Sequence, residues 1–483
     1  MNLERSGAPP PDSRPRRDGF WWLLLGAALV SRAVWVLWVH PPQGHAFSDM
    51  AHYLHRAREL AANGPAVHPG PGTRDLVWQP WGTHTLLALP LFLFGDGGLG
   101  LTVAALIWGL CSAATVILSH ALARAALPAT RLGPWPARIV GLLALAWIPH
   151  LDHAGYFVSE APFTCALLAT VLGLVAVDAR LRRSEPPLGS VLGAGLAGAA
   201  AFALRPESAI LVVFACLVLA YRHRQLRVVA ALLAPLLVVA LASAARVQLH
   251  AGRPGIAENA AVNRSAGRCH AVVIWAVPDE ATRAAIEAAR ERDGPDAYEA
   301  YRHLGRRVSL PGFRALARRG DAHPLALRPA LAEELVFVGH IGDPEPHRAL
   351  RRRCWAATGV LGQARYALTH LALLTAIARP WPESADHPSP WQLPLALLGR
   401  RAALVVHLLA ALGLLLVILP RRRESPVERS DDFPRIVCAL ALLSLAIVAV
   451  AFFGSPRLRA PYDPYALILA VWAVPAARQR LRS

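Results

Sequence analysis

The first apolar part of the chain reads GFWWLLLGAALVSRAVWVLWVHPPQGHAFSDM, residues 19–50. Its residues 20–39 are almost wholly apolar, which gives a helix long enough to cross the roughly 30 Å hydrocarbon core of a bilayer. An arginine-rich segment, residues 14–17, comes just before it. We therefore predict a signal anchor whose preceding tail, residues 1–19, stays in the cytoplasm. Arg32 lies deep inside this span and needs a polar partner within the protein.

The composition of the whole chain is that of a membrane protein. Of its 483 residues, 55% are hydrophobic and 17% are charged, whereas a soluble domain carries about 25% charged residues. A soluble globular enzyme, a secreted disulfide scaffold and a disordered chain are thereby excluded. The net charge of +18 is of the kind that nucleic-acid-binding proteins carry. Here the arginines cluster between apolar blocks, so the charge indicates membrane orientation, with no nucleic acid as partner.

Charge also sorts the apolar blocks into spans and surface helices. Trp81–Phe94 is too short to cross easily, and the arginine-rich loops alternate correctly only if it lies on the membrane surface. The same argument makes Gly359–Ile377 an interfacial helix. We predict about ten spans with both termini cytoplasmic, near Phe20–Val39, Leu99–Ala121, Ile139–Pro149, Phe157–Val177, Leu188–Leu204, Ala209–Tyr221, Val228–Ala245, Ala402–Leu419, Ile436–Phe453 and Tyr462–Val474.

The expected fold is therefore an all-α polytopic membrane protein of the cell inner or plasma membrane. Residues 20–249 form a transmembrane core whose first extracytoplasmic loop, 40–98, holds an amphipathic surface helix. Residues 250–400 form a mostly helical extracytoplasmic insertion, because so long a polar segment is exempt from the charge rule. Residues 401–483 add the last spans and a basic tail.

Asp49 is the first candidate for chemistry. It follows the first span at the start of the amphipathic helix, where Ser48 or Asp49 can serve as a helix cap. The functional interpretation is a carboxylate at the membrane–water boundary, which is where a general base for a lipid-linked reaction must stand.

A second acidic group follows in Asp152 and Glu160. Glu160 lies inside the start of an apolar run, where an ionisable residue is costly and indicates either an interhelical hydrogen bond or a function. Asp152 is expected in a short outer loop, either solvated or reactive. With His150 and His153 it offers a weak candidate set for a divalent metal. No other cofactor is expected.

Arginines near the outer ends of spans are the candidates for binding a phosphate. Arg205 follows the span 188–204, and Arg457 and Arg459 precede the last span. A guanidinium at the headgroup level can bind phosphate through two parallel hydrogen bonds, or can reach lipid headgroups without a specific role.

Two cysteines, Cys269 and Cys354, lie in the polar insertion, whereas the other four lie in apolar segments. If the insertion is extracytoplasmic, a disulfide could join this pair.

The order of several short motifs resembles one superfamily. The motifs are an acid after the first span, a proline-rich start of a second surface helix and a Ser-Glu-x-Pro-Phe step, followed by Leu-Arg-Pro and by Arg-x-x-x-Pro before the last span. They stand at Asp49, Gln79–Trp81, Ser159–Phe163, Leu204–Pro206 and Arg457–Pro461, with Phe94-Gly95 before a span and a looser match at Glu258–His270. The chain resembles GT-C membrane glycosyltransferases, similar to the family 39 type that includes protein mannosyltransferases and the lipid A aminoarabinose transferase. It departs from many members in having Asp49-Met50 in place of two adjacent acids, which bears on metal use and on substrate identity.

The resemblance implies a transferase that moves a sugar from a polyprenyl-phosphate donor to a hydroxyl of a lipid, glycan or protein, with inversion at the anomeric carbon. Asp49 would be the base and Glu160 or Asp152 would orient the acceptor or the sugar. Arg459, with Arg205 and Arg457, would hold the phosphate, and membrane lipids would surround the protein.

Two other classes stay open. A transporter of lipid-linked glycans predicts broken helix pairs in matching halves, and the sequence shows no such symmetry. A polysaccharide ligase or polymerase predicts its key residues in a large late loop, such as Arg314, His323 or His340.

Overall fold

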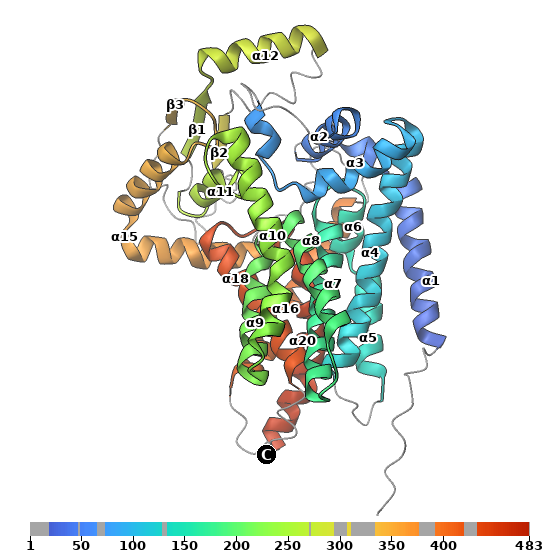
Figure 1. Ribbon diagram of the computed structural model, residues 1–483. Coiled ribbons are helices and arrows are strands. Elements are labelled where there is room, and N and C mark those ends of the chain that lie inside the picture. Colours follow the sequence, from blue (N-terminus) through green and yellow to red (C-terminus); the bar gives the residue numbers. More distant parts are fainter. Residues whose placement is uncertain are drawn as a thin grey trace, which may run out of the picture.

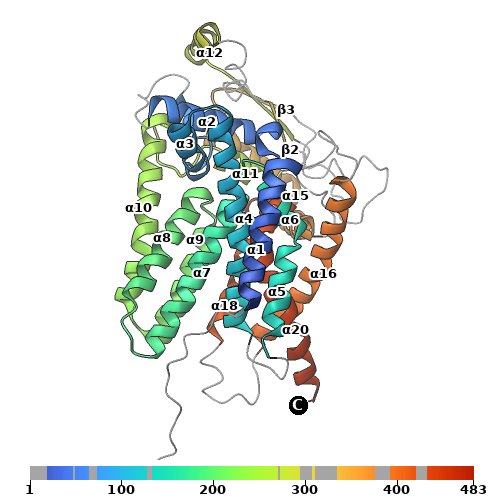
Figure 2. The ribbon, with the colours of Figure 1, turned by 90° about the vertical axis from the view of Figure 1, so that its right-hand side faces the viewer.

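The computed structural model describes residues 19–46, 49–64, 73–127, 133–269, 272–293, 307–310, 334–375, 392–419 and 432–482. Long helices stand side by side in a bundle, and a smaller polar domain covers one end of it (Figures 1 and 2). We call this end the domain end. The C-terminal helix ends at the opposite side of the bundle.

Six described helices are long and apolar enough to cross a membrane. Their bounds in the structure are α1 (Gly19–Val34, continued to Val39 by a π-helical turn), α4 (Gly98–Ala126), α7 (Glu160–Arg182), α10 (Leu226–Ala251), α16 (Gln392–Ile418) and α18 (Phe433–Ala451). Shorter apolar helices pack among them, namely α3 (Gly82–Phe94), α5 (Trp135–Leu145), α8 (Leu188–Leu204) and α9 (Ser208–His223). The bundle also contains the C-terminal helix α20 (Asp463–Arg482). The prediction of a helical, polytopic membrane protein is confirmed.

Small residues let these helices approach closely, as is usual inside membranes, where lipid tails are as apolar as leucine. A Cβ atom on Gly413 of α16 would lie 2.6 Å from the backbone oxygen of Leu469 in α20. Large apolar side chains such as Leu237 and Leu408 stay exposed on the outside of the bundle. An exposed leucine surface of this kind suits lipid and not water.

The domain end is built from the first loop, the insertion and two short connections. Its elements are η2 (Pro42–His45), α2 (Asp49–Asn63), η3 (Thr73–Val77), α6 (Ile148–Ala154), α11 (Ala260–Ala266), β1 (Val272–Val277), α12 (Glu280–Asp293), β2 (Arg307–Leu310), β3 (Glu334–Val338), α15 (Pro344–Thr375), α19 (Pro456–Arg459) and η4 (Ala460–Tyr462). The strands form one sheet of order β2-β1-β3, in which β1 pairs antiparallel with β2 and parallel with β3.

Two local predictions are corrected, and one feature was not expected. The described part of the insertion is mostly helical, as predicted, but β-branched and aromatic residues in Val272–Val277 and Glu334–Val338 add strands to it, as such residues favour. The span expected at Ile139–Pro149 breaks after Leu145, because Pro149 starts a new short helix, α6. Asp152 consequently lies in that helix and not in a loop.

Candidate functional site

Four chain segments meet at the domain end of the bundle, and each brings a charged residue. Asp49 is the first residue of α2 and Glu160 the first residue of α7. Glu160 gains from this position, because free N–H groups at a helix N-terminus favour a carboxylate. Arg205 lies between α8 and α9, and Arg457 lies in the single turn α19.

Prolines explain why the two arginines stand at breaks in the helices. Pro206 disfavours a helical conformation of the residue before it, and Arg205 is accordingly extended, with φ −151° and ψ 106°. Pro456 occupies the first turn of α19, where its missing N–H costs nothing. The Ser455 hydroxyl caps this turn by accepting from the backbone N–H of Leu458 at 3.3 Å.

The four residues form one continuous ion-pair network. Arg457 donates from Nη1 to Asp49 Oδ2 at 2.5 Å and from Nε to Glu160 Oε1. Arg205 donates from Nη1 to the same Glu160 oxygen at 3.1 Å. Its Nε donates to Glu207 Oε1 at 2.6 Å. Glu160 therefore links both guanidinium groups, and three carboxylates face two arginines.

Burial separates the roles of the two carboxylates that Arg457 joins. The Glu160 side chain is 1% exposed, whereas that of Asp49 is 41% exposed. Burial opposes the charge of Arg457, but Glu160 and Asp49 outweigh it and raise the pKa of this guanidinium. Glu160 is thus a fixed internal anchor, and Asp49 is the carboxylate that a substrate can reach.

Tyr53 lies close enough to this network to sense its charges. It stands one turn after Asp49 on the same face of α2 and is buried. Burial raises the pKa of its phenol, and the Asp49 carboxylate raises it further. The sequence pattern Asp49-x-x-x-Tyr53 carries the spacing that could have indicated this neighbour.

The residues considered for a metal do not form a ligand set. His150 Nε2 is hydrogen-bonded to the Ala460 carbonyl at 2.9 Å, and His153 Nδ1 to the Pro149 carbonyl at 2.5 Å. Within the described ranges, no three His, Cys, Asp or Glu side chains are placed to share a metal. Asp152 lies nearby on α6, where burial raises the pKa of its carboxyl to about 7.

A small internal cavity lies behind Glu160. It has room for about one water molecule. Its lining consists of Ser112, Thr115, His150, His153, Glu160, Ala161, Thr164 and Ala460. The space behind Glu160 is thus too small for a sugar, whereas the Asp49 side chain is 41% exposed on the other side of Arg457.

Arg459 does not join this network. Its Nε lies 3.1 Å from Asp463 Oδ1, its Nη1 donates to the Leu374 carbonyl at 3.0 Å, and the side chain is buried. The helical turn α19 explains the separation, because residues two apart on a helix point to different sides. In this arrangement the guanidinium of Arg459 contacts Asp463 and the Leu374 carbonyl and faces away from Asp49 and Glu160.

A basic group that the sequence analysis did not single out lies beside α2, beyond Asp49. It consists of Arg246 of α10, His84 of α3 and Arg56 of α2. Arg246, near the end of α10, donates to the Leu76 carbonyl and lies 3.4 Å from His84 Nε2. Because arginine can only donate, His84 Nε2 accepts and Nδ1 carries the proton. That Nδ1 is buried without a hydrogen-bond partner. Burial and the nearby Arg246 lower the pKa of His84, so the imidazole stays neutral.

Arg56 adds a second guanidinium to this basic group. It is 5% exposed, pairs with Glu59 and lies 3.7 Å from the buried Asp75. Arg56 stands two turns after Asp49, which is about 10 Å along the helix axis. Arg246 directly follows the predicted span 228–245, and an arginine at that boundary was the sequence signal that could have pointed to this group.

Two residues of the ligase alternative, Arg314 and His323, lie outside the described residues. His340, the third, is buried in the insertion, 3.6 Å from Glu258 and 3.7 Å from Asp75. Glu258 also pairs with Arg74 and Arg253. These contacts join the insertion to the first loop.

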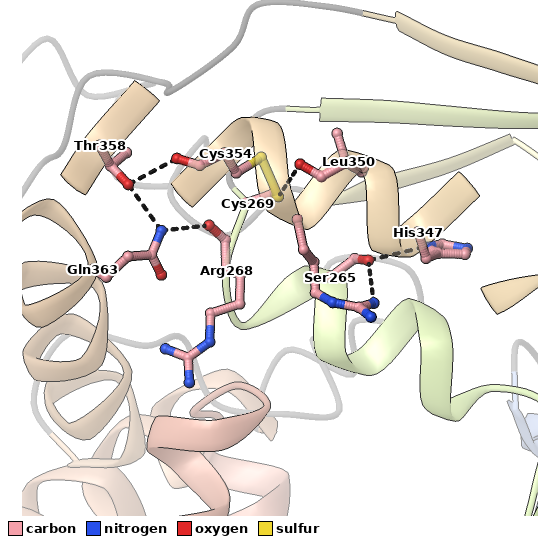
Figure 3. Close-up of a disulfide and its surroundings, with 9 residues drawn as sticks. Ser265, Arg268, Cys269, His347, Leu350, Cys354, Thr358 and Gln363 are labelled. Carbon is pink, nitrogen blue, oxygen red and sulfur yellow. Dashed lines mark hydrogen bonds between the residues drawn. A yellow bond between two sulfur atoms is a disulfide. The ribbon is translucent and has the colours of Figure 1, made fainter. Parts of the chain in front are cut away.

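Cys269 and Cys354 form a disulfide, with their Cα atoms 5.6 Å apart. It joins the segment just after α11 to the first half of α15, and Figure 3 shows it among the hydrogen bonds of Thr358 and Gln363.

The chain matches no protein-family model and no curated protein sequence. Solved structures do resemble it. ArnT from Cupriavidus metallidurans in the apo state is 15% identical, with a TM-score of 0.39, over 94% of this chain and 77% of that chain. ArnT bound to undecaprenyl phosphate is 13% identical, with a TM-score of 0.36, over 95% of this chain and 78% of that chain.

The archaeal oligosaccharyltransferase AglB from Archaeoglobus fulgidus, in complex with an inhibitory peptide and a dolichol-phosphate, is 12% identical with a TM-score of 0.46. The match covers 96% of this chain and 51% of that one, so the chain spans about half the length of AglB. ArnT and AglB are thus two of the solved proteins that this chain resembles.

Proposed function

We propose that the chain is a membrane glycosyltransferase that moves a sugar from a polyprenyl-phosphate donor to a hydroxyl acceptor on the extracytoplasmic side. The observation that carries the proposal is the network at the domain end, in which an exposed carboxylate, Asp49, is held by an arginine that a buried Glu160 anchors. The domain end is extracytoplasmic because the arginine-rich loops lie at the other end of the spans.

Asp49 acts as the general base in this proposal. The acceptor hydroxyl loses its proton to Asp49 as its oxygen attacks the anomeric carbon, and the bond from that carbon to the phosphate oxygen breaks. Attack from the side opposite the leaving phosphate inverts the configuration. A positioned base of this kind contributes about 10²–10⁴-fold to the rate.

Glu160 positions the base and does not exchange protons itself. It is almost fully buried and holds Arg457 and Arg205 through one oxygen. A buried carboxylate between two guanidinium groups stays ionised, because each positive charge favours the charged form. Arg457 then fixes the direction in which the Asp49 carboxylate points.

In this proposal the phosphate of the donor binds to the basic group beside α2. Three carboxylates already face Arg205 and Arg457, so this network disfavours a further anion. Within the part of the chain that the structure describes, Arg246 has the Leu76 carbonyl and His84 as its hydrogen-bond partners, and the Nδ1 of His84 has none. We therefore assign the phosphate to Arg246, His84 and Arg56, which moves this role away from Arg205, Arg457 and Arg459.

No step of this mechanism passes through a metal ion. The carboxylates of the network are engaged by arginines, and His150 and His153 are bonded to backbone carbonyls. Among the described residues, no three His, Cys, Asp or Glu side chains are placed to share a metal ion, so the proposal assigns none.

The test is transfer of radiolabelled sugar from a polyprenyl-phosphate donor, with the purified full chain in detergent. Formation of a glycosylated acceptor supports the proposal, and the configuration of the new bond, measured by NMR, reports inversion. A lipid-linked glycan transporter would move the donor across a proteoliposome membrane without breaking the sugar–phosphate bond. That outcome, with no transfer in detergent over a panel of acceptors, would overturn the proposal.

A further inference from the structure

The helix α15 bends sharply at Gly359, and its two halves have different surroundings. Gly359 has φ 62° and ψ −175°, a conformation that only glycine adopts readily. The first half carries the disulfide to Cys269, which fixes it to α11 (Figure 3). In Figure 1 the second half runs roughly across the direction of the spans, beside the domain end of α18.

The second half exposes an apolar stripe. Val360 is 75% exposed, Leu361 71% and Leu368 59%. With Ala364 they recur at the spacing of one helix face, and Arg365, also exposed, stands at the edge of that face. Trp355, just before the bend, is exposed as well, and so is Arg352. An apolar stripe with arginine at its edge and tryptophan at its end is the pattern of a helix lying in a membrane surface.

The opposite face of the same segment packs on the chain that leads to the network. A Cβ atom on Gly454 would lie 1.7 Å from the His370 backbone oxygen, so the two backbones touch directly. The backbone N–H of Gly454 donates to His370 Nδ1 at 3.1 Å. Arg459 of α19 donates to the Leu374 carbonyl at the end of α15.

These contacts join α15 to the turn that bears Arg457. Arg457 precedes Arg459 by two residues in α19 and is itself the partner of Asp49 and Glu160. A shift of the second half of α15 relative to the bundle would therefore move the arginine that orients Asp49.

We propose that residues 360–375 dock in the membrane leaflet at the domain end and bind anionic lipid headgroups through Arg352 and Arg365. The apolar stripe enters the boundary of the acyl chains, and the arginines lie at the phosphate level. This lipid contact holds α19 in place, so that anionic lipid supports activity without being a substrate. The exposed apolar stripe and the two arginines favour a lipid surface over a protein partner. An interfacial helix places apolar side chains toward the acyl chains and arginines beside the headgroups, and the stripe has this arrangement.

A spin-label experiment tests the docking without any activity. The full chain, with Cys111, Cys165, Cys216 and Cys438 replaced by serine and the disulfide kept, receives a nitroxide at Leu361→Cys in nanodiscs. The matched control is Glu345→Cys, at the exposed start of the same helix. We expect the Leu361 label to collide readily with oxygen and poorly with a soluble nickel complex, and the Glu345 label to do the reverse. Equal access of nickel to both labels overturns the docking, as does dipolar broadening that shows a second copy on the stripe.

The activity arm rests on the proposed glycosyl transfer. Turnover is compared in nanodiscs of phosphatidylcholine with and without phosphatidylglycerol, at a fixed donor concentration. For the Arg352→Gln/Arg365→Gln variant we expect the activation by phosphatidylglycerol to fall by about fivefold for each of the two arginines removed, from the energy of one arginine at an anionic surface. Arg348→Gln, whose arginine pairs with Glu345 on the first half, should keep the activation. Unchanged activation in the double variant overturns the coupling, whereas absence of transfer in every lipid, with normal spin-label depths, counts against the proposed function alone.

Discussion

The exchange of Asp49 for asparagine removes one carboxylate and changes little else. The amide keeps the shape of the side chain and one oxygen that can accept from Arg457 Nη1, which in the wild type donates to Asp49 Oδ2 at 2.5 Å. Asparagine also serves well at the start of a helix, so α2 should still begin in the same place. The change therefore separates the ability to take a proton from the shape of the site.

Two magnitudes follow from the structure. The Asp49 side chain is 41% exposed, and exposed ion pairs contribute at most about 1 kcal/mol to stability. Loss of a general base costs about 10²–10⁴-fold in turnover, which corresponds to about 3–5 kcal/mol of transition-state stabilisation. We expect a nearly unchanged melting temperature together with a turnover at least 100-fold lower.

The assay measures transfer of labelled sugar and, separately, binding of the donor. Asp96→Asn is the matched control, because Asp96 also lies at the domain end and pairs with an arginine, Arg58, at 2.7 Å. The control should turn over normally. If Asp49→Asn binds donor and turns over within a few-fold of the wild type, Asp49 is not the base.

Four further results are expected. Glu160→Gln removes a buried carboxylate from two partly buried guanidinium groups, so stability should fall by about 3–5 kcal/mol; a fall below about 1 kcal/mol in chemical denaturation would contradict its role as anchor. Arg246→Gln should weaken donor binding at least tenfold, as for a hydrogen bond to a charged group, without changing the melting temperature; equal affinity by calorimetry would remove it from the phosphate site. Reduction of the disulfide, or Cys269→Ser, should lower the stability by about 4 kcal/mol on the chain-entropy account, and an unshifted melting curve would argue against it. Because burial raises the folded-state pKa of Asp152 to about 7, above its usual value near 4, the folded state binds more protons between these values. The wild type should lose stability as pH rises through that window, and Asp152→Asn should not. If the melting temperatures of the two proteins changed equally with pH, the raised pKa of Asp152 would be contradicted.

Several features of this chain could be read from local sequence alone. Apolar blocks of about 20 residues predict the long helices α1, α4, α7, α10, α16 and α18, since a bilayer requires that length. The prolines of Leu-Arg-Pro and of Ser-Pro-Arg predict breaks, because proline restricts the residue before it and cannot donate. Asp49 was indicated by its place directly after a span.

Other features depended on how distant segments meet. The sequence does not say which acid Arg457 or Arg459 contacts. The packing of α19 against α15 and α20 pairs Arg457 with Glu160 and Arg459 with Asp463. The small sheet was not expected, because β1 and β3 are paired across more than fifty residues. Such pairing depends on contacts that no local pattern records.

The sequence by itself determined that the chain lies in a membrane and where most of its helices run, because hydrophobic length and charge act locally along the chain. The tertiary structure alone decided which arginine faces which carboxylate, and that Arg246, His84 and Arg56 gather beside α2. The physical reason is that an ion pair depends on a distance of a few ångströms between segments up to 408 residues apart, and that distance is set by packing.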